Sequence, residues 1–90
     1  MFELQFKGDK VEEIDKIVKE FNARPLLPIV EKNKAKFFGY DFMGDIIDIF
    51  YKPQKNTTLF ILYQYPKNVS DKETYKIGLE KLLNELSLLK

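Results

Sequence analysis

The first 23 residues change from a strand-like to a helix-like pattern of apolar positions. In the segment FELQFK, residues 2–7, every second side chain is apolar. Successive side chains of a strand point to opposite faces, so this alternation predicts a half-buried β-strand. From Asp9 the apolar residues recur at helical spacing, and Glu12, three residues on, suggests a capping box. We expect a helix over residues 9–23, because Pro25 disfavours the helical conformation just before it.

The middle of the chain predicts strands. Residues 26–31 are apolar but interrupted by prolines, which favours an edge strand or an extended connector. The segment KFFGYDFMGDIIDIFY, residues 36–51, predicts a hairpin with Met43-Gly44 as its tight turn. In that register one face carries Phe38, Tyr40, Phe42, Ile47, Ile49 and Tyr51 and is expected to form the core. The second face is mixed and carries Phe37, Gly39, Asp41, Ile46, Asp48 and Phe50.

The last third of the chain predicts one more strand and a long helix. LFILYQYP, residues 59–66, is rich in β-forming residues on both faces, as expected for a strand near the middle of a sheet. Ser70 and Glu73 fit an S-x-x-E capping box. A continuous apolar stripe follows and predicts a helix that runs to about residue 88. The stripe consists of Tyr75, Leu79, Leu82, Leu83 and Leu86.

The order of these elements predicts the fold class. Residues 1–90 form a single domain with the order β-α-(β)-β-β-β-α. Two amphipathic helices and one mostly antiparallel sheet favour an α+β two-layer sandwich with both helices on one face.

The composition excludes several kinds of chemistry. The 90 residues contain no cysteine and no histidine, so disulfides, thiolate metal sites and imidazole-dependent triads are excluded. The 15 basic and 14 acidic residues nearly balance, which gives no strong field for polyanions. There is no apolar run of signal-peptide or transmembrane length, so we expect a cytoplasmic protein that does not bind membranes.

Three aspartates in the central hairpin need an explanation. Asp41, Asp45 and Asp48 could bind a hard cation or act as an acid, as paired carboxylates do. Their spacing does not match a calcium loop, however. Aspartates on the wetter face and at the turn also protect an apolar hairpin from aggregation, and we favour this interpretation. We therefore expect no metal site, no cofactor and no catalytic residue.

Nucleic-acid binding is the alternative function. Aromatic side chains on an open sheet with basic neighbours stack bases in RNA-recognition domains. The residues that could act in this way are Lys32, Lys34, Lys36, Tyr40, Tyr63 and Tyr65. Three observations argue against nucleic-acid binding: the element order, the near-neutral charge and the presence of a single arginine.

A non-enzymatic interaction module is the function that the sequence favours. Two helices can cover only one face of the sheet, and a small protein rarely leaves a large apolar patch exposed. We expect a homodimer, or a subunit of a larger complex, that binds through the open sheet face. The residues predicted for this contact are Phe37, Ile46, Phe50, Leu88 and Leu89.

Overall fold

A computed structural model of the chain describes residues 1–21, 23–26, 30–43, 45–64 and 70–90. Its elements, in chain order, are β1 (Phe2–Lys7), α1 (Val11–Lys19), β2 (Arg24–Pro25), β3 (Val30–Lys32), β4 (Ala35–Phe42), β5 (Asp45–Gln54), β6 (Thr57–Gln64) and α2 (Lys72–Ser87). The described part is therefore an α+β fold with the order β-α-β-β-β-β-β-α. In it, no helix is both long enough and apolar enough to cross a membrane.

The strands form one open sheet in which every described pair is antiparallel. The strand order is β1-β6-β5-β4-β2, and β3 pairs separately with β4. In the central hairpin Phe42 lies opposite Asp45 and Phe38 lies opposite Ile49, which confirms the predicted register. The strand predicted at 59–66 begins two residues earlier, and it lies inside the sheet between β1 and β5, as expected. Residues 65 and 66 lie outside the described residues.

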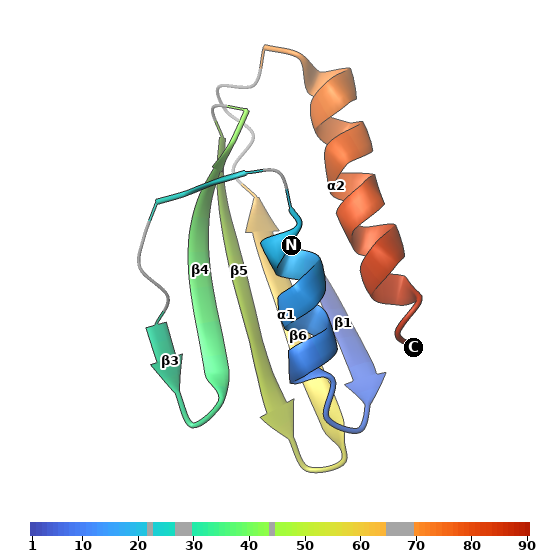
Figure 1. Cartoon of the computed structure of the whole chain (residues 1–90). Coiled ribbons are helices and arrows are strands. Elements are labelled where there is room, and N and C mark those ends of the chain that lie inside the picture. Colours follow the sequence, from blue (N-terminus) through green and yellow to red (C-terminus); the bar gives the residue numbers. More distant parts are fainter. Residues whose placement is uncertain (22, 27–29, 44, 65–69) are drawn as a thin grey trace.

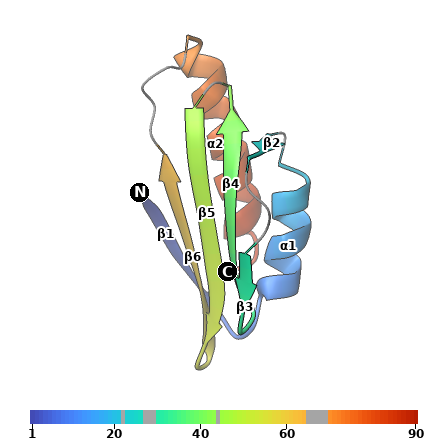
Figure 2. The same ribbon diagram turned by 90° about the vertical axis from the view of Figure 1, so that its left-hand side faces the viewer.

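Both helices lie against the same face of the sheet, which makes the fold two-layered (Figure 1). Figure 2 shows the sheet from its β4 side, with α1 and α2 together on one side of it. The core lies between the layers. It is formed by Phe6, Val11, Ile14, Val18, Tyr40, Phe42, Ile47, Ile49, Tyr51, Phe60, Leu62, Tyr75, Leu79, Leu82 and Leu86. The predicted core face of the hairpin and the predicted stripe of the second helix both belong to this core or pack against it.

Thr58 fixes the start of α1 against the sheet. Its hydroxyl is fully buried, accepts a hydrogen bond from the backbone N–H of Lys10 at 2.8 Å and donates one to the Gly8 carbonyl at 2.7 Å. Gly8 has a φ of 76°, a left-handed conformation that favours glycine. The N-cap of α1 is Lys10 and not Asp9 as predicted, and the carboxylate of Asp9, one residue earlier, accepts a hydrogen bond from the N–H of Val11.

The first helix is shorter than the sequence pattern suggests. It ends at Lys19 rather than near residue 23. Phe21 instead packs its ring against Tyr40 and Phe42, with ring centroids 5.8 and 5.0 Å away. Beyond it, β2 pairs with β4. Tertiary packing thus overrides the helical periodicity of the last predicted turn.

Two further boundaries differ from expectation. The N-cap of α2 is Asp71, not Ser70, since Asp71 accepts from the backbone N–H of Thr74 at 3.0 Å and from its hydroxyl at 2.8 Å. These hydrogen bonds hold the pKa of the Asp71 carboxyl below its usual value. Of the edge strand or connector expected at 26–31, the end at residues 30 and 31 belongs to β3, which pairs with β4, and residues 27–29 lie outside the described residues.

Candidate functional site

The sheet face that the helices leave uncovered carries an apolar row across three neighbouring strands. Phe37 of β4 lies opposite Phe50 of β5, and Phe50 lies opposite Ile61 of β6. Their side chains share one face, because residues paired across antiparallel strands point the same way. All three are half-buried, although no described helix or strand lies over them.

Further apolar side chains extend this row on both sides. Leu59 of β6 lies on one side and is half-buried, while Ile46 of β5 and Tyr63 of β6 lie on the other. Ile46 is 52% and Tyr63 45% exposed. We call Phe37, Ile46, Phe50, Leu59, Ile61 and Tyr63 the open-face patch. A contiguous apolar patch of this kind is typical of a surface that contacts a partner.

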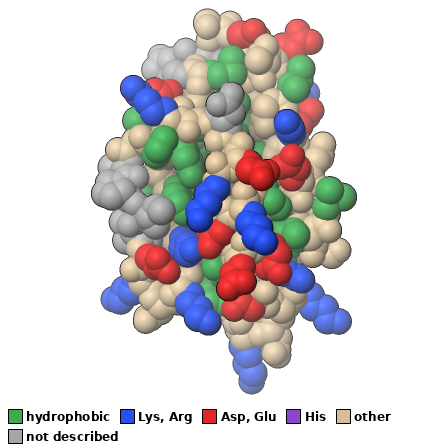
Figure 3. All heavy atoms as spheres, viewed as in Figure 1, with side chains coloured by type: hydrophobic (Ala, Val, Ile, Leu, Met, Phe, Trp, Pro, Cys, Tyr) green, Lys and Arg blue, Asp and Glu red, His purple; other side chains and the backbone are tan. Residues whose placement is uncertain are grey.

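The opposite surface, over the helices, carries many charged side chains. Figure 3 shows acidic and basic side chains interspersed on the helix-bearing side. The exposed residues of α1 illustrate this, because Glu12, Glu13, Lys16 and Lys19 all point away from the sheet. The open-face patch lies on the other side of the sheet from these charged residues.

Two opposite charges border the apolar row on the same strand. Asp48 precedes and Lys52 follows Phe50 by two residues, so all three point to the open face. Asp48 lies opposite Tyr63, and Lys52 lies opposite Leu59. Four residues of extended strand separate the two charges by about 13 Å, too far for an ion pair within one chain. Within the described residues neither of them forms a salt bridge.

The structure divides the predicted contact residues into two groups. Phe37, Ile46 and Phe50 lie together on the open face. Leu88 is 85% exposed, but it follows α2 on the other side of the sheet, and Leu89 packs against the core. The two leucines therefore do not extend the open-face patch. Strand alternation had already placed Asp48 on the same face as Phe50, and the same alternation could have identified Lys52 on its other side from the sequence.

The residues considered for nucleic-acid binding are dispersed. Tyr40 is 7% exposed and lies in the core, on the opposite face from Tyr63. Lys32 and Lys34 are exposed at the β3–β4 turn, whereas Lys36 is half-buried and ion-paired. Tyr65 lies outside the described residues. The arrangement brings no two tyrosines of this set together on one described surface.

Lys36 belongs to a polar network beneath α1. Its ammonium lies 2.5 Å from the carboxylate of Asp15, and the hydroxyl of Tyr51 donates to the other oxygen of that carboxylate. Burial, followed by the hydrogen bond to Asp15, raises the pKa of Tyr51 far above its ordinary value. Both oxygens are thus satisfied, and the network ties α1 to β4 and β5.

The aspartates of the hairpin separate into three environments. Asp45 is 3% exposed, so it is a buried residue and not a solvated turn residue as predicted. The register explains this, because Asp45 lies opposite Phe42 on the core face, where it accepts a hydrogen bond from the Tyr75 hydroxyl at 2.6 Å. Asp41 pairs with Arg24 at 2.8 Å at the sheet edge, and Asp48 is half-buried on the open face.

No catalytic or metal-binding constellation is apparent in the described part of the chain. No group of three or more acidic side chains there could hold a metal ion. Two of the carboxylates that are buried or half-buried, Asp15 and Asp45, have tyrosine hydroxyl partners.

Comparison with known proteins adds no functional assignment. No protein-family model matches the sequence, and neither a curated protein nor a solved structure matches it.

Proposed function

We propose that this protein is a non-enzymatic interaction module that forms a homodimer through the open face of its sheet. The single observation that supports the proposal most strongly is the row Phe37–Phe50–Ile61, which crosses three strands on a face without a described covering element. A second copy of the chain is a suitable partner because the face carries opposite charges, Asp48 and Lys52, at equal distances on either side of Phe50. Closed two-fold dimers are the commonest form of self-association.

The charges around Phe50 define the symmetry of this dimer. A two-fold axis that runs along the apolar row, between the two sheets, places Phe50 against Phe50 of the partner. The same rotation reverses the strand direction and brings Lys52 of each copy over the partner's Asp48. Aligned sheets cross at about 30°, which displaces each charge by about 3.4 Å, less than one strand spacing. A lysine side chain is long enough to span that displacement.

The size of the face is sufficient for a stable contact. The path β1-β6-β5-β4-β2 spans roughly 19 Å at ordinary strand spacing, and β5 is roughly 34 Å long. A projected area of this order approaches the ~800 Å² that each partner buries in a standard interface. The two Lys52–Asp48 pairs would lie at the border of the apolar row and select the orientation of the two copies.

A charge-exchange experiment tests both the face and the symmetry. Asp48→Lys alone, and Lys52→Asp alone, place like charges opposite each other in each homodimer and should weaken it. An equimolar mixture of the two variants should restore association, because opposite charges then meet at both positions. Light scattering after gel filtration and native mass spectrometry of the mixture measure this heterodimer directly.

Exposed charges elsewhere provide the matched control. Lys16→Asp, on the outer side of α1, should leave the dimer unchanged. Far-ultraviolet circular dichroism verifies that each variant is folded. Equal dimer strength in Asp48→Lys, Lys52→Asp and their mixture would refute the proposed arrangement.

A further inference from the structure

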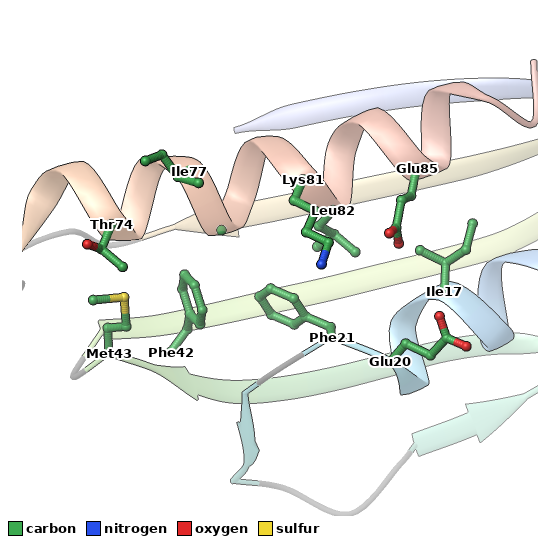
Figure 4. Close-up of a pocket in the computed structure, with 11 residues that line it drawn as sticks. Ile17, Glu20, Phe21, Phe42, Met43, Thr74, Ile77, Lys81, Leu82 and Glu85 are labelled. Carbon is green, nitrogen blue, oxygen red and sulfur yellow. The ribbon is translucent and has the colours of Figure 1, made fainter.

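A second apolar surface lies on the opposite side of the molecule, in a groove between α2 and the end of α1. Figure 4 shows this groove with Phe42 and Phe21 along its floor and α2 along one wall. Its volume is about 400 Å³. Pockets that bind small molecules fall in the range of about 300–1,000 Å³. The groove is therefore large enough for a small ligand.

The groove results from the unequal lengths of the helices and from one glycine. α1 has nine residues and α2 has 16, so the first turns of α2 have no helix beside them. At Gly78 the ring of Phe42 approaches to 2.5 Å from where a Cβ atom would lie. This close approach sets the depth of the floor. Phe42 is 7% exposed and Ile77, on the wall, is 60% exposed.

The charged side chains of the groove lie toward one end, where Ile17 lies beside Glu20 and Glu85 (Figure 4). Met43 and Ile77 line one end, whereas Glu20, Lys81 and Glu85 gather toward the other, near α1 (Figure 4). None of these three charged side chains has a salt bridge or a side-chain hydrogen bond within the described residues. The charged end thus carries two carboxylates and one ammonium group.

We infer that this groove binds a hydrophobic cation, an amphiphile with an apolar body and an ammonium head. The apolar body would lie over Phe42, Met43 and Ile77. The head would lie between Glu20 and Glu85, whose two negative charges exceed the single positive charge of Lys81. An anionic amphiphile would instead meet net negative charge.

This site is independent of the proposed dimer. The groove lies on the helix-bearing side of the sheet, and the open-face patch lies on the other. Neither surface shares a residue with the other, so failure of one proposal leaves the other unaffected.

Three ten-carbon probes with different head groups test the inference. Decylammonium, decanol and decanoate, at concentrations at which they are monomeric, are titrated into the ¹⁵N-labelled protein and followed by NMR. We expect shifts at Ile77 and Gly78, with decylammonium bound most tightly and decanoate most weakly. Removing one partly exposed carboxylate should weaken decylammonium about three- to five-fold.

Variants of the charged residues separate recognition of the head group from non-specific hydrophobic binding. Glu20→Gln combined with Glu85→Gln should bring the affinity for decylammonium down to that for decanol. Glu80→Gln, on the same helix but outside the groove, should leave the preference unchanged. Equal binding of the three probes, no binding, or shifts centred on Ile46 and Tyr63 of the open face would overturn the inference.

Discussion

At position 78 the protein has glycine in the middle of a 16-residue helix, where alanine is ordinarily preferred by about 1 kcal/mol. Contact with Phe42 explains the choice. The Phe42 ring is held between Phe21 and Tyr75, with ring centroids 5.0 and 5.3 Å away, and so has little freedom to move aside. Gly78, which has no side chain, therefore allows α2 to approach the sheet closely.

Gly78→Ala should consequently destabilise the protein, against the usual helical trend. We expect a loss of about 1–3 kcal/mol in the free energy of unfolding, as for other overpacked sites. Urea unfolding followed by circular dichroism measures it. Asn84→Ala, at an exposed position of the same helix, is the control and should be neutral or slightly stabilising. A more stable Gly78→Ala variant would show that the close approach is not maintained.

Tyr75 has a different role at the residue scale, because its hydroxyl is the described hydrogen-bond donor to the buried Asp45 carboxylate. Tyr75→Phe leaves that carboxylate without this donor, and we expect a loss of about 1.5–3 kcal/mol. Tyr63→Phe removes an exposed hydroxyl from the other face of the sheet and should change stability by less than about 0.5 kcal/mol. If urea midpoints showed equal effects for the two variants, the buried contact would contribute nothing.

At the scale of elements, the turn between β3 and β4 contains local strain. Lys32 pairs with Ala35, so Asn33 and Lys34 form a two-residue loop, with φ values of 52° and 65°. Two positive φ values are typical of a type I′ turn, in which Asn-Gly is the preferred sequence. Asparagine tolerates this conformation, whereas lysine adopts it only at a cost.

Lys34→Gly should therefore stabilise the hairpin, by about 0.5–1 kcal/mol, through relief of that strain. Thermal or urea unfolding measures the change. Lys32→Gly is the matched control; it lies within β3 and should destabilise, because glycine weakens a strand. If Lys34→Gly destabilised the protein, the lysine side chain would contribute more stability than the strain of its backbone costs.

The elements also show which features the sequence could predict. Alternation around Met43-Gly44 predicted the register of the central hairpin, since a slip of one residue would turn Phe42 and Ile47 away from the core. The same register places Asp45 on the core face, but an aspartate beside a glycine turn suggests a solvated position. Its burial depends on Tyr75, 30 residues later, and that pairing has no local signal.

The candidate site was predictable only where local strand alternation determines it. Phe37, Ile46 and Phe50 follow from strand alternation, which acts over a few residues. Leu89 was assigned to the open face but packs against the core, because its environment depends on long-range packing. Strand alternation had correctly placed Tyr40 on the core face, which conflicts with its assignment in the nucleic-acid alternative. The groove beside Gly78 was not predicted, because it arises from the difference in length between the two helices.

At the scale of the whole molecule, buried tyrosines make the stability of the fold depend on pH in the alkaline range. Burial is the main cause that raises the pKa of Tyr40, Tyr51 and Tyr75 above 10.0. The contribution of each tyrosine to the free energy of unfolding is fully present below its pKa in the unfolded state. It is lost as the pH rises toward its pKa in the folded state. We expect the urea midpoint to fall progressively above about pH 10.

The slope of that fall identifies the groups responsible. Tyr51→Phe should show a shallower decline of the urea midpoint between about pH 9 and pH 11.5, because one raised phenol has been removed. Tyr63→Phe serves as the comparison on the open face. A midpoint independent of pH over this interval in the unmodified protein would contradict the account.

The central claim is that the open sheet face is covered by a second copy of the chain. The most direct test is the molar mass in solution, measured by light scattering after gel filtration at low and at high salt. The account predicts twice the 10.7 kDa mass of the chain at both salt concentrations, because the apolar row contributes most of the contact. A mass of 10.7 kDa at every protein concentration tested would contradict it.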